Sequence, residues 1–411
     1  MKSKIILIAL VISAYACSHS STQGDGSVKE VMVGGNKVSV LLLDKVKSGT
    51  VTIPLSSLVD DFEMVQLEMH EDAIFGETNK ITVTENYIGV LPFSNNYKLF
   101  DRSGKFISAL SRRGKGPGEF PFSLNDAIID DKNGIVYLSA FPNKILVYNT
   151  SGVYLKEFVI PQPFFDNNQM YLSDGILTAI CAPKTFQQPG RTYNAEIMVA
   201  KFDVNTGELL EKLPPPFEHL ILRSHVGFPN SHQNVPGVFD WVPNYHSLEQ
   251  SQYDTLYHID IKRNKFLPFF TVANHLINEG IIASFRQVNK NLMMIQLIKA
   301  GAWDPYSEFI VADLSSKTSS RYHKIVNDYL GNLDIPVRTL SNGNGRFING
   351  YFANSIQPED LMEDIEEHLA ESSCTEKDRE VLKKTLSKLK EGTNNVVFIG
   401  KIKEEIKTNL W

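Results

Sequence analysis

The stretch NYKLFDRSGKFISALSRRGKGPGEF, residues Asn96 to Phe120, decides the fold. Its first part alternates apolar and polar residues, as a half-buried strand does, and a second alternating run begins at Lys105. Between them stand Asp101 and Gly104, of which Asp can bond its own backbone and Gly accepts a positive φ. The stretch therefore predicts two antiparallel strands joined by a tight turn.

The same unit recurs along the chain at intervals of about 50 residues, the period that four-stranded propeller blades produce. The further copies are NKILVYNTSGVYLKEFVIP (Asn143 to Pro161), EIMVAKFDVNTGELLEKLP (Glu196 to Pro214), DTLYHIDIKRNKFLPFFTV (Asp254 to Val272) and SEFIVADLSSKTSSRYHKI (Ser307 to Ile325). Five full units and an incomplete sixth predict an all-β fold, a six-bladed β-propeller.

The two ends of the repeat region indicate how the ring closes. Strand Phe62 to Glu68 precedes the first full unit, and strand Asn395 to Lys401 ends the incomplete last one. Closed propellers commonly let an amino-terminal strand complete the last blade, which removes exposed sheet edges. We therefore expect Phe62 to Glu68 to pair with Asn395 to Lys401.

The last blade contains the one clearly helical stretch, residues 358–391. Leu361, Ile365 and Leu369 fall on one face at helical spacing. A second helix from Thr375 to Lys390 begins with Thr375 as its cap and Asp378 in the position of a capping box. We expect a helical hairpin that lies on the propeller and shields it.

The amino terminus has the pattern of a secretory signal, residues 1–16, with an apolar run from Ile5 to Ile12 that is too short to span a bilayer. Two processing routes stay open. Ala14-Tyr15-Ala16 satisfies the small-x-small rule for release of a soluble protein. Cys17 after a small residue is typical of lipidation at a bacterial lipobox, although the usual leucine is Ala14 here. We favour lipidation of Cys17, because a polar tether (18–27) follows it.

This interpretation divides the chain into a signal peptide (1–16), a lipid-anchor tether with an amino-terminal segment (17–50) and the propeller (51–411).

The 411 residues carry a net charge of −6 and 42% hydrophobic residues, which excludes disorder and gives no sign of nucleic-acid binding. Cys181 and Cys374 are 193 residues apart, show no zinc-ligand spacing and are interpreted as free thiols, although pairing in an oxidising compartment stays open. We expect no metal or other cofactor, and a monomer.

Three stretches carry a resemblance to a known family: GKGPGEF (Gly114 to Phe120), IPLSSLVDDFEMVQLE (from Ile53) and YDTLYHID (Tyr253 to Asp260). They resemble the bacterial family of six-bladed β-propeller lipoproteins, themselves similar to NHL-repeat propellers. The resemblance covers most of the chain from about Ile53 onward. It implies the propeller fold and a lipid-anchored place in a bacterial cell envelope, periplasmic or on the cell surface, but no particular chemistry.

The glycines of GKGPGEF do not form a phosphate loop, because that motif needs Gly-Lys-Ser/Thr entering a helix. The stretch is better explained as a tight crossover between blades, with Arg112 and Arg113 beside it. Acidic pairs such as Asp130-Asp131 are interpreted as solvated turns. No sequence motif for a nucleophile elbow or a metalloprotease helix is present.

Long connections gather on one predicted face, where binding sites on rigid scaffolds usually lie. Histidines cluster between residues 219 and 246 without the spacing of a metal motif, and Trp303 is the best placed aromatic for stacking on a flat ligand. Solvated histidines and aromatic packing between blades are the simpler explanations. The candidate ligand-binding residues are Arg112, Arg113, His225, His232, Tyr245, His246, Trp303 and Tyr306.

The sequence thus favours a membrane-anchored, cell-envelope binding propeller without evident catalysis. Its partner is an unidentified ligand, for which a glycan or an envelope protein would fit. Two alternatives stay open. One is an envelope carbohydrate-active enzyme, a lyase or hydrolase, that uses the histidine-rich region. The other is a protein-interaction scaffold that uses the helical insertion.

Overall fold

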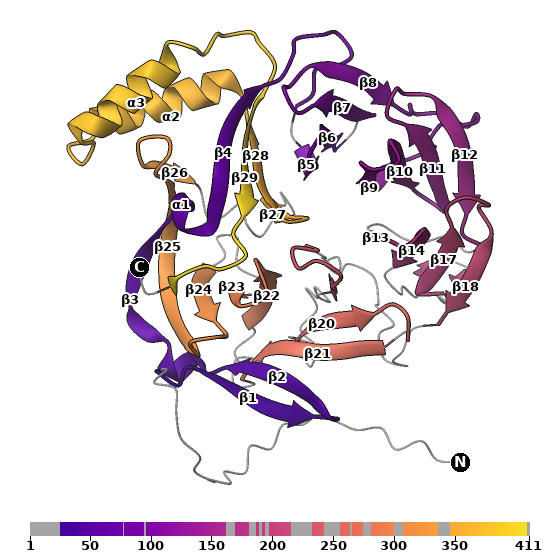
Figure 1. The fold of residues 1–411 in the computed structure, drawn as a ribbon, viewed down its shortest axis with the longest axis horizontal. Helices are drawn as coiled ribbons and strands as arrows, with labels where there is room; N and C mark the ends of the chain where they lie inside the picture. Colours follow the sequence, from indigo (N-terminus) through magenta and orange to yellow (C-terminus); the bar gives the residue numbers. More distant parts are fainter. Residues whose placement is uncertain are drawn as a thin grey trace.

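The computed structural model places six small β-sheets around one central axis, which confirms the predicted six-bladed β-propeller (Figure 1). In the regular blades the first strand of the unit lies nearest the axis and the later strands follow outward as antiparallel neighbours. The structure describes residues 25–76, 78–93, 96–161, 169–180, 186–188, 191–193, 197–214, 232–241, 255–263, 265–273, 281–299, 307–335 and 346–408.

Blades one to three follow the repeated unit closely. Blade one consists of β5 (Thr78–Val83), β6 (Tyr87–Pro92), β7 (Tyr97–Asp101) and β8 (Phe106–Leu110). Blade two consists of β9 (Leu124–Asp130), β10 (Ile135–Ala140), β11 (Lys144–Asn149) and β12 (Tyr154–Val159). Blade three consists of β13 (Gln169–Ser173), β14 (Ile176–Ile180), β17 (Val199–Asp203) and β18 (Leu209–Leu213). A separate small hairpin, β15 (Phe186–Gln188) and β16 (Arg191–Tyr193), lies in the connection between β14 and β17.

The turn between the third and fourth strands of a blade has the chemistry that its sequence predicts. Asp101 Oδ1 accepts hydrogen bonds from the backbone N–H of Ser103 at 2.9 Å and of Lys105 at 3.0 Å. Gly104 follows with a φ of 89°. Asn149 and Asp203 accept backbone hydrogen bonds in the corresponding turns of blades two and three. These local bonds set the hairpin register before any contact between blades is needed.

Blades four and five take in strands from the amino-terminal segment. Blade four contains β19 (Phe239–Trp241), β20 (Thr255–Asp260) and β21 (Lys265–Val272), continued outward by β2 (Asn36–Leu41) and β1 (Val28–Val33). Blade five contains β22 (Ile281–Gln287), β23 (Leu292–Lys299), β24 (Ser307–Asp313), β25 (Thr318–Asn327) and β26 (Leu333–Ile335), with β3 (Lys47–Pro54) beside β25.

Both additions to these blades are parallel pairings, of β2 with β21 and of β3 with β25. A short 3-10 turn, Leu43–Lys45, connects β2 to β3. The packed structure therefore includes residues such as Ser27, which is fully buried, ahead of the residue 51 at which the sequence division starts the propeller.

Blade six joins the two ends of the chain. Its strands β27 (Phe347–Ile348), β28 (Tyr351–Ile356) and β29 (Val396–Ile402) come from the carboxyl-terminal part, and its outermost strand β4 (Val59–Gln66) comes from the amino-terminal part. β4 runs antiparallel to β29, with Val65 opposite Val397 and Gln66 opposite Val396. This pairing confirms the predicted closure, with β4 beginning at Val59 rather than Phe62.

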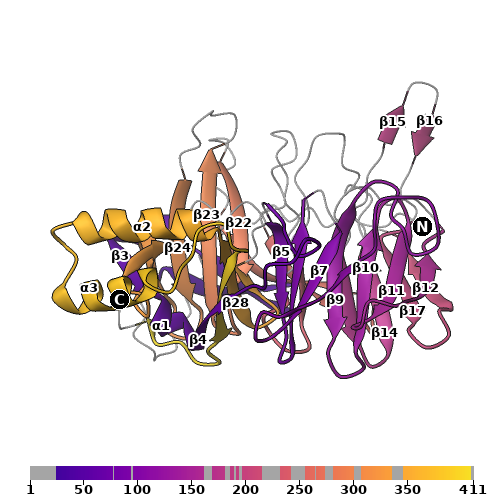
Figure 2. The same cartoon turned by 90° about the horizontal axis from the view of Figure 1, so that it is seen from above.

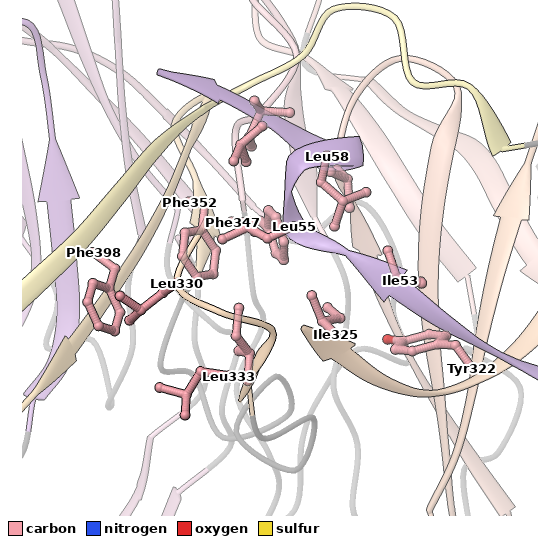
Figure 3. Packing of buried hydrophobic residues seen from close by; sticks show 14 of the residues in the cluster. Ile53, Leu55, Leu58, Tyr322, Ile325, Leu330, Leu333, Phe347, Phe352 and Phe398 are labelled. Carbon is pink, nitrogen blue, oxygen red and sulfur yellow. The ribbon is translucent and has the colours of Figure 1, made fainter. Parts of the chain in front are cut away.

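The largest core cluster lies between blades five and six. The short helix α1 (Leu55–Leu58) turns the chain from β3 into β4 and inserts Leu55 and Leu58, both fully buried, into this cluster. Figure 3 shows Leu55 beside Phe347 and Phe352. Cys374 is a free, buried thiol in the same cluster. The corner that feeds the closing strand is therefore held by apolar packing.

The insertion in blade six is the predicted helical hairpin, α2 (Pro358–Ala370) and α3 (Glu376–Leu386). It lies outside the ring beside β26 (Figure 1). Leu361, Ile365 and Leu382 are fully buried in the cluster between blades five and six. Thr375 accepts from the Asp378 N–H at 3.2 Å and the Asp378 side chain accepts from Thr375, which completes the predicted capping box. The helices thus cover apolar surface of the rim.

The propeller has two distinct faces. The turn between the first and second strands of a blade lies against the turn between its third and fourth strands, as the Arg102 N–H shows by donating to the Asn86 carbonyl at 3.0 Å. The Thr150 N–H and the Gly134 carbonyl repeat this bond in blade two at 2.9 Å. We call this side the turn face. The opposite side is the crossover face, from which β15 and β16 project (Figure 2).

Replacing Val65 with proline tests the closure. The Leu67 N–H donates to the Asn395 carbonyl at 3.0 Å, and antiparallel alternation then makes Val65 a hydrogen-bonded position and Gln66 an outward-facing one. We expect Val65→Pro to lower the free energy of unfolding by about 3 kcal/mol or more in urea titrations. Gln66→Pro, corrected for side-chain loss with Gln66→Ala, should cost much less. Equal losses at the two positions would contradict this register.

Candidate functional site

The two arginines proposed from the sequence lie on the crossover from β8 to β9. Arg112 has an 81% exposed side chain and pairs with Glu119 at 2.6 Å. Arg113 is also exposed, and its backbone bridges to Phe120. Both residues therefore leave the outermost strand of blade one, far along the blade from the central axis.

The glycine-rich stretch beside them has a structural role. Glu119 accepts a hydrogen bond from the Gly116 N–H at 2.8 Å, and this bond together with Arg112 holds the pKa of Glu119 below its usual range. The Gly118 carbonyl accepts from the hydroxyls of Ser111 and Tyr148, and Gly118 has a φ of 74°. The stretch pins the crossover onto blade two, as the sequence interpretation expects.

Among the other candidates, only His232 lies in the described part of the chain. It is buried on the innermost segment of blade four, and its carbonyl accepts from the Asn349 N–H in the β27–β28 turn at 2.8 Å. His232 is therefore next to the turn face, so the structure does not bring it together with Arg112 and Arg113. The candidates that lie outside the described residues are His225, Tyr245, His246, Trp303 and Tyr306.

A buried His–Asp pair fixes this innermost segment. Asp240 accepts from the His232 N–H at 3.0 Å, from the Gln233 N–H at 2.6 Å and from His232 Nδ1 at 3.1 Å. Burial alone would raise the pKa of Asp240, but these hydrogen bonds and the imidazole hold it below its usual range, so the carboxylate stays ionised. Burial, followed by the charge of Arg286, lowers the pKa of His232, so its ring is neutral.

The segment His232–Asn234, here called the channel strap, connects blade four to its neighbours across the axis. The Gln233 amide donates to the Met170 carbonyl of blade three at 2.9 Å. The Asn234 amide donates to the Gln287 carbonyl of blade five and the Phe347 carbonyl of blade six, both at 2.9 Å. The Gly350 N–H of blade six donates back to Asn234 Oδ1 at 3.1 Å. The strap thus holds three blades at the centre of the ring.

A cavity of about 700 Å³ opens beside the strap. Blades one, two, three, four and six all contribute to its wall, which places it at the turn-face mouth of the central channel. We call it the channel-mouth cavity. Its lining residues are Thr82, Val83, Thr84, Glu85, Asn86, Ile128, Ile129, Asp130, Asp131, Lys132, Leu172, Gln233, Asn349 and Tyr351. Its volume is in the range that small-molecule sites occupy.

Two of the lining residues have an unusual backbone. Gln233 has a φ of 50° and Asn349 a φ of 53°, in the left-handed region that side-chain-bearing residues seldom adopt. They lie close together, because the Asn349 N–H bonds the residue before Gln233. Such conformations cluster at ligand sites, where the surrounding structure maintains the strain. Gly350 follows Asn349 between β27 and β28, and Asn-Gly is the favoured pair for a two-residue hairpin turn, so the sequence signals Asn349 but not Gln233.

Blades one and two are joined at this mouth by a pair of polar side chains. Asp131 accepts from the Asn86 side-chain amide at 2.9 Å and from the Asn86 N–H at 3.1 Å. The Asp130-Asp131 pair, interpreted from the sequence as a solvated turn, therefore forms part of a cavity wall. Across the residues that the structure describes, no group of three or more His, Cys, Asp or Glu side chains could hold a metal ion. Nor does this part contain a helix long and apolar enough to cross a membrane.

The sequence from residue 38 to residue 401 matches the family described as Domain of unknown function (DUF4934). The chain belongs to this family. A crystal structure of a Bacteroides fragilis protein assigned as exported has a TM-score of 0.56 and 14% identity, over 86% of this chain and 98% of that one. A DUF4221-family protein from Bacteroides vulgatus has 12% identity and a TM-score of 0.43, over 85% of this chain and 98% of that one. No curated protein matches the chain.

The neutral His232 predicts a dependence of stability on pH. In the unfolded chain a histidine takes up a proton near pH 6.5, whereas His232 in the folded protein resists protonation, so acidification favours unfolding. We expect the free energy of unfolding to fall between about pH 7 and pH 5, by up to about 1.4 kcal/mol per pH unit for this residue. Urea titrations of His232→Gln should show a shallower dependence, whereas exposed His323→Gln should not. An unchanged slope in His232→Gln would refute a neutral, buried His232.

Proposed function

We propose that this protein is a cell-envelope binding propeller, anchored to a bacterial membrane through Cys17, that captures a small ligand in the channel-mouth cavity. The observation that carries the proposal is the cavity itself, whose wall is assembled from five blades and is held by the channel strap. A ligand at such a place contacts residues that no single blade could bring together. Rigid walls of this kind lose little entropy when a ligand binds.

The proposed location rests on the amino terminus. The apolar run after Lys4 and the Ala16-Cys17 junction are typical of an exported lipoprotein. The polar residues 18–24 would act as a tether between the lipid anchor and the folded domain. The similar fold of the Bacteroides fragilis protein assigned as exported agrees with an extracytoplasmic place. The acidic sequence, with its net charge of −6, gives no support for nucleic acid as the ligand.

The turn-face cavity replaces the crossover face as the favoured site. Arg112 is engaged by Glu119, and His232 is buried behind Gln233 rather than exposed in a loop. Trp303 and the other aromatic candidates, which lie outside the described residues, remain the sequence-based proposal for a second surface. Loss of binding in Trp303→Ala, with binding unchanged in cavity variants, would favour that surface instead.

A hydrolytic or lyase function is the second candidate, and the His232–Asp240 pair is the observation that favours it. The bond from Nδ1 to Asp240 assigns the ring proton to Nδ1 and leaves Nε2 able to accept a proton. The neighbouring Gln233 lines the cavity. With a 4% exposed side chain, however, His232 is better placed to hold the strap than to reach a substrate. Glycan turnover that disappears in His232→Gln would favour the enzyme.

Filling the cavity tests the binding proposal. Leu172→Trp places a large ring in the cavity wall, and Leu210→Trp makes the same change at an exposed position on outer strand β18. We expect a mixed panel of sugars, peptides, nucleotides and organic acids to contain a compound that raises the unfolding temperature. At 100 times its dissociation constant, it should add about 2.7 kcal/mol of apparent stability. Only Leu172→Trp should abolish the effect. Retention of the effect in that variant would move the site elsewhere.

Lipidation is tested at its own residue. We expect Cys17→Ser to abolish incorporation of a labelled fatty acid and to move the protein from the membrane fraction to the soluble envelope fraction, because the acylated thiol is then missing. Cys374→Ser is the matched control, since Cys374 is buried in the core. Labelling that persists in Cys17→Ser would rule out the proposed anchor.

A further inference from the structure

We infer that the ligand of the channel-mouth cavity is a small, hydroxyl-rich molecule of the sugar or polyol class that carries no acidic group. This inference rests on the proposed function and adds the chemistry of the ligand. Three features of the cavity support it: a pair of buried hydroxyl groups at its wall, the charges around it, and the kinds of side chain that line it.

The hydroxyl pair comes from blade one. The phenol of Tyr97 on β7 crosses β6 above Gly89, where a Cβ would come within 1.7 Å of its oxygen. Gly89 stands opposite Thr82 on the innermost strand β5, and Thr82 lines the cavity. The Tyr97 hydroxyl thereby reaches Thr82 through a gap that only glycine leaves open, so Tyr97 supports Thr82 from behind while Thr82 itself lines the cavity.

Both hydroxyls are buried, with Tyr97 at 0% and Thr82 at 3% exposure. The two hydroxyls contact each other, which opposes the effect of burial on the pKa of Tyr97, and within the described residues neither has any other hydrogen-bond partner. Burial also raises the pKa of Tyr97, so the phenol keeps its proton and can donate it. Each hydroxyl can both donate and accept, so the Tyr97–Thr82 contact leaves hydrogen-bonding capacity unused, and a hydroxyl-bearing ligand beside Thr82 would use it.

The charges around the cavity select against anions. Glu85, Asp130 and Asp131 line it with carboxylates, whereas Lys132 is the one cationic side chain among its lining residues. A phosphate or carboxylate ligand would meet a net negative wall in a partly enclosed space, where charges are weakly screened. Neutral and cationic ligands meet no such repulsion.

The remaining lining groups suit a polyhydroxylated ligand. Asn86 and Gln233 present amides that Asp131 and the Met170 carbonyl already hold in place, so they are oriented before a ligand arrives. Tyr351 adds an aromatic ring with a polar tip, which can contact both the apolar and the polar parts of a sugar. Gln233 maintains a strained backbone at the same wall. A purely apolar ligand would leave the remaining hydrogen-bonding capacity of these amides unused.

The test measures binding of three matched disaccharides by calorimetry: neutral diacetylchitobiose, its cationic deacetylated form, and anionic digalacturonate. We expect the neutral or cationic sugar to bind at least about tenfold more tightly than the anionic one, with binding lost in Leu172→Trp. Tighter binding of digalacturonate, or binding of only peptides or apolar compounds in the cavity, would overturn the inference while leaving the binding function intact. If no compound of the mixed panel binds in a way that Leu172→Trp alters, the proposed function itself fails.

Two tyrosine variants separate binding from folding. Tyr97→Phe removes the hydroxyl that contacts Thr82 and no other group of the described residues, so we expect little change in the unfolding temperature and an affinity for the sugar about tenfold lower. Tyr148→Phe removes a hydroxyl that donates to the Gly118 carbonyl on blade two, so stability should fall while affinity stays unchanged. An affinity in Tyr97→Phe equal to that of the natural protein would remove the buried hydroxyl pair from the site and overturn the inference.

A third pair of variants tests the strained wall. Gln233→Gly relaxes a φ of 50° but also removes the lining amide and its bond to the Met170 carbonyl, so these effects on stability oppose each other while the sugar should bind more weakly. Lys317→Gly makes the same backbone change at a φ of 58° on a turn of blade five, and it should leave binding unchanged. Equal sugar affinities in the two variants would contradict a contact between Gln233 and the ligand.

Discussion

The antiparallel pairing of β4 with β29 is the contact on which the ring depends. It joins segments from opposite ends of the chain, as the bond from the Gln66 amide to the Asn394 carbonyl shows across 328 residues. Without it, blade six would lack its outer strand and β29 would present an unpaired edge. The loop entropy of so long a closure is offset by the ladder together with apolar packing of Leu55 and Leu58 behind it.

The same segment stabilises more than one blade. Residues from Lys47 to Pro54 pair with the outer strand of blade five before the chain turns at α1 and completes blade six. The hairpin of β1 and β2 similarly extends blade four. The amino-terminal part of the chain is thus a belt around blades four to six, and blades one to three have the more regular sequence repeat. Blades four to six, whose repeat is irregular, are thus completed by amino-terminal strands, whereas blades one to three are built from their own repeat units alone.

The candidate site arises where the repeat is broken. In blade four the channel strap does not pair as a strand, and its side chains bond to blades three, five and six instead. Because Asn234 satisfies two carbonyls and accepts one N–H, this crossing can be buried without leaving its amide unpaired. Through Gln233 the strap forms part of the cavity wall, together with residues of blades one, two, three and six.

The sequence by itself determined the propeller, its six blades, the closing strand and the helical hairpin, because Asp-x-x-Gly turns, strand alternation and helical spacing act over a few residues. It could not place the site. His232 resembles a loop histidine until Asp240 and the blades around it bury it, and Asp130-Asp131 resembles a solvated turn until Asn86 meets it across a blade boundary. The gap above Gly89 through which Tyr97 approaches Thr82 is likewise absent from any local pattern. Only the tertiary structure decides these features, because each depends on which strands lie nearest the axis and which residues from distant blades meet there.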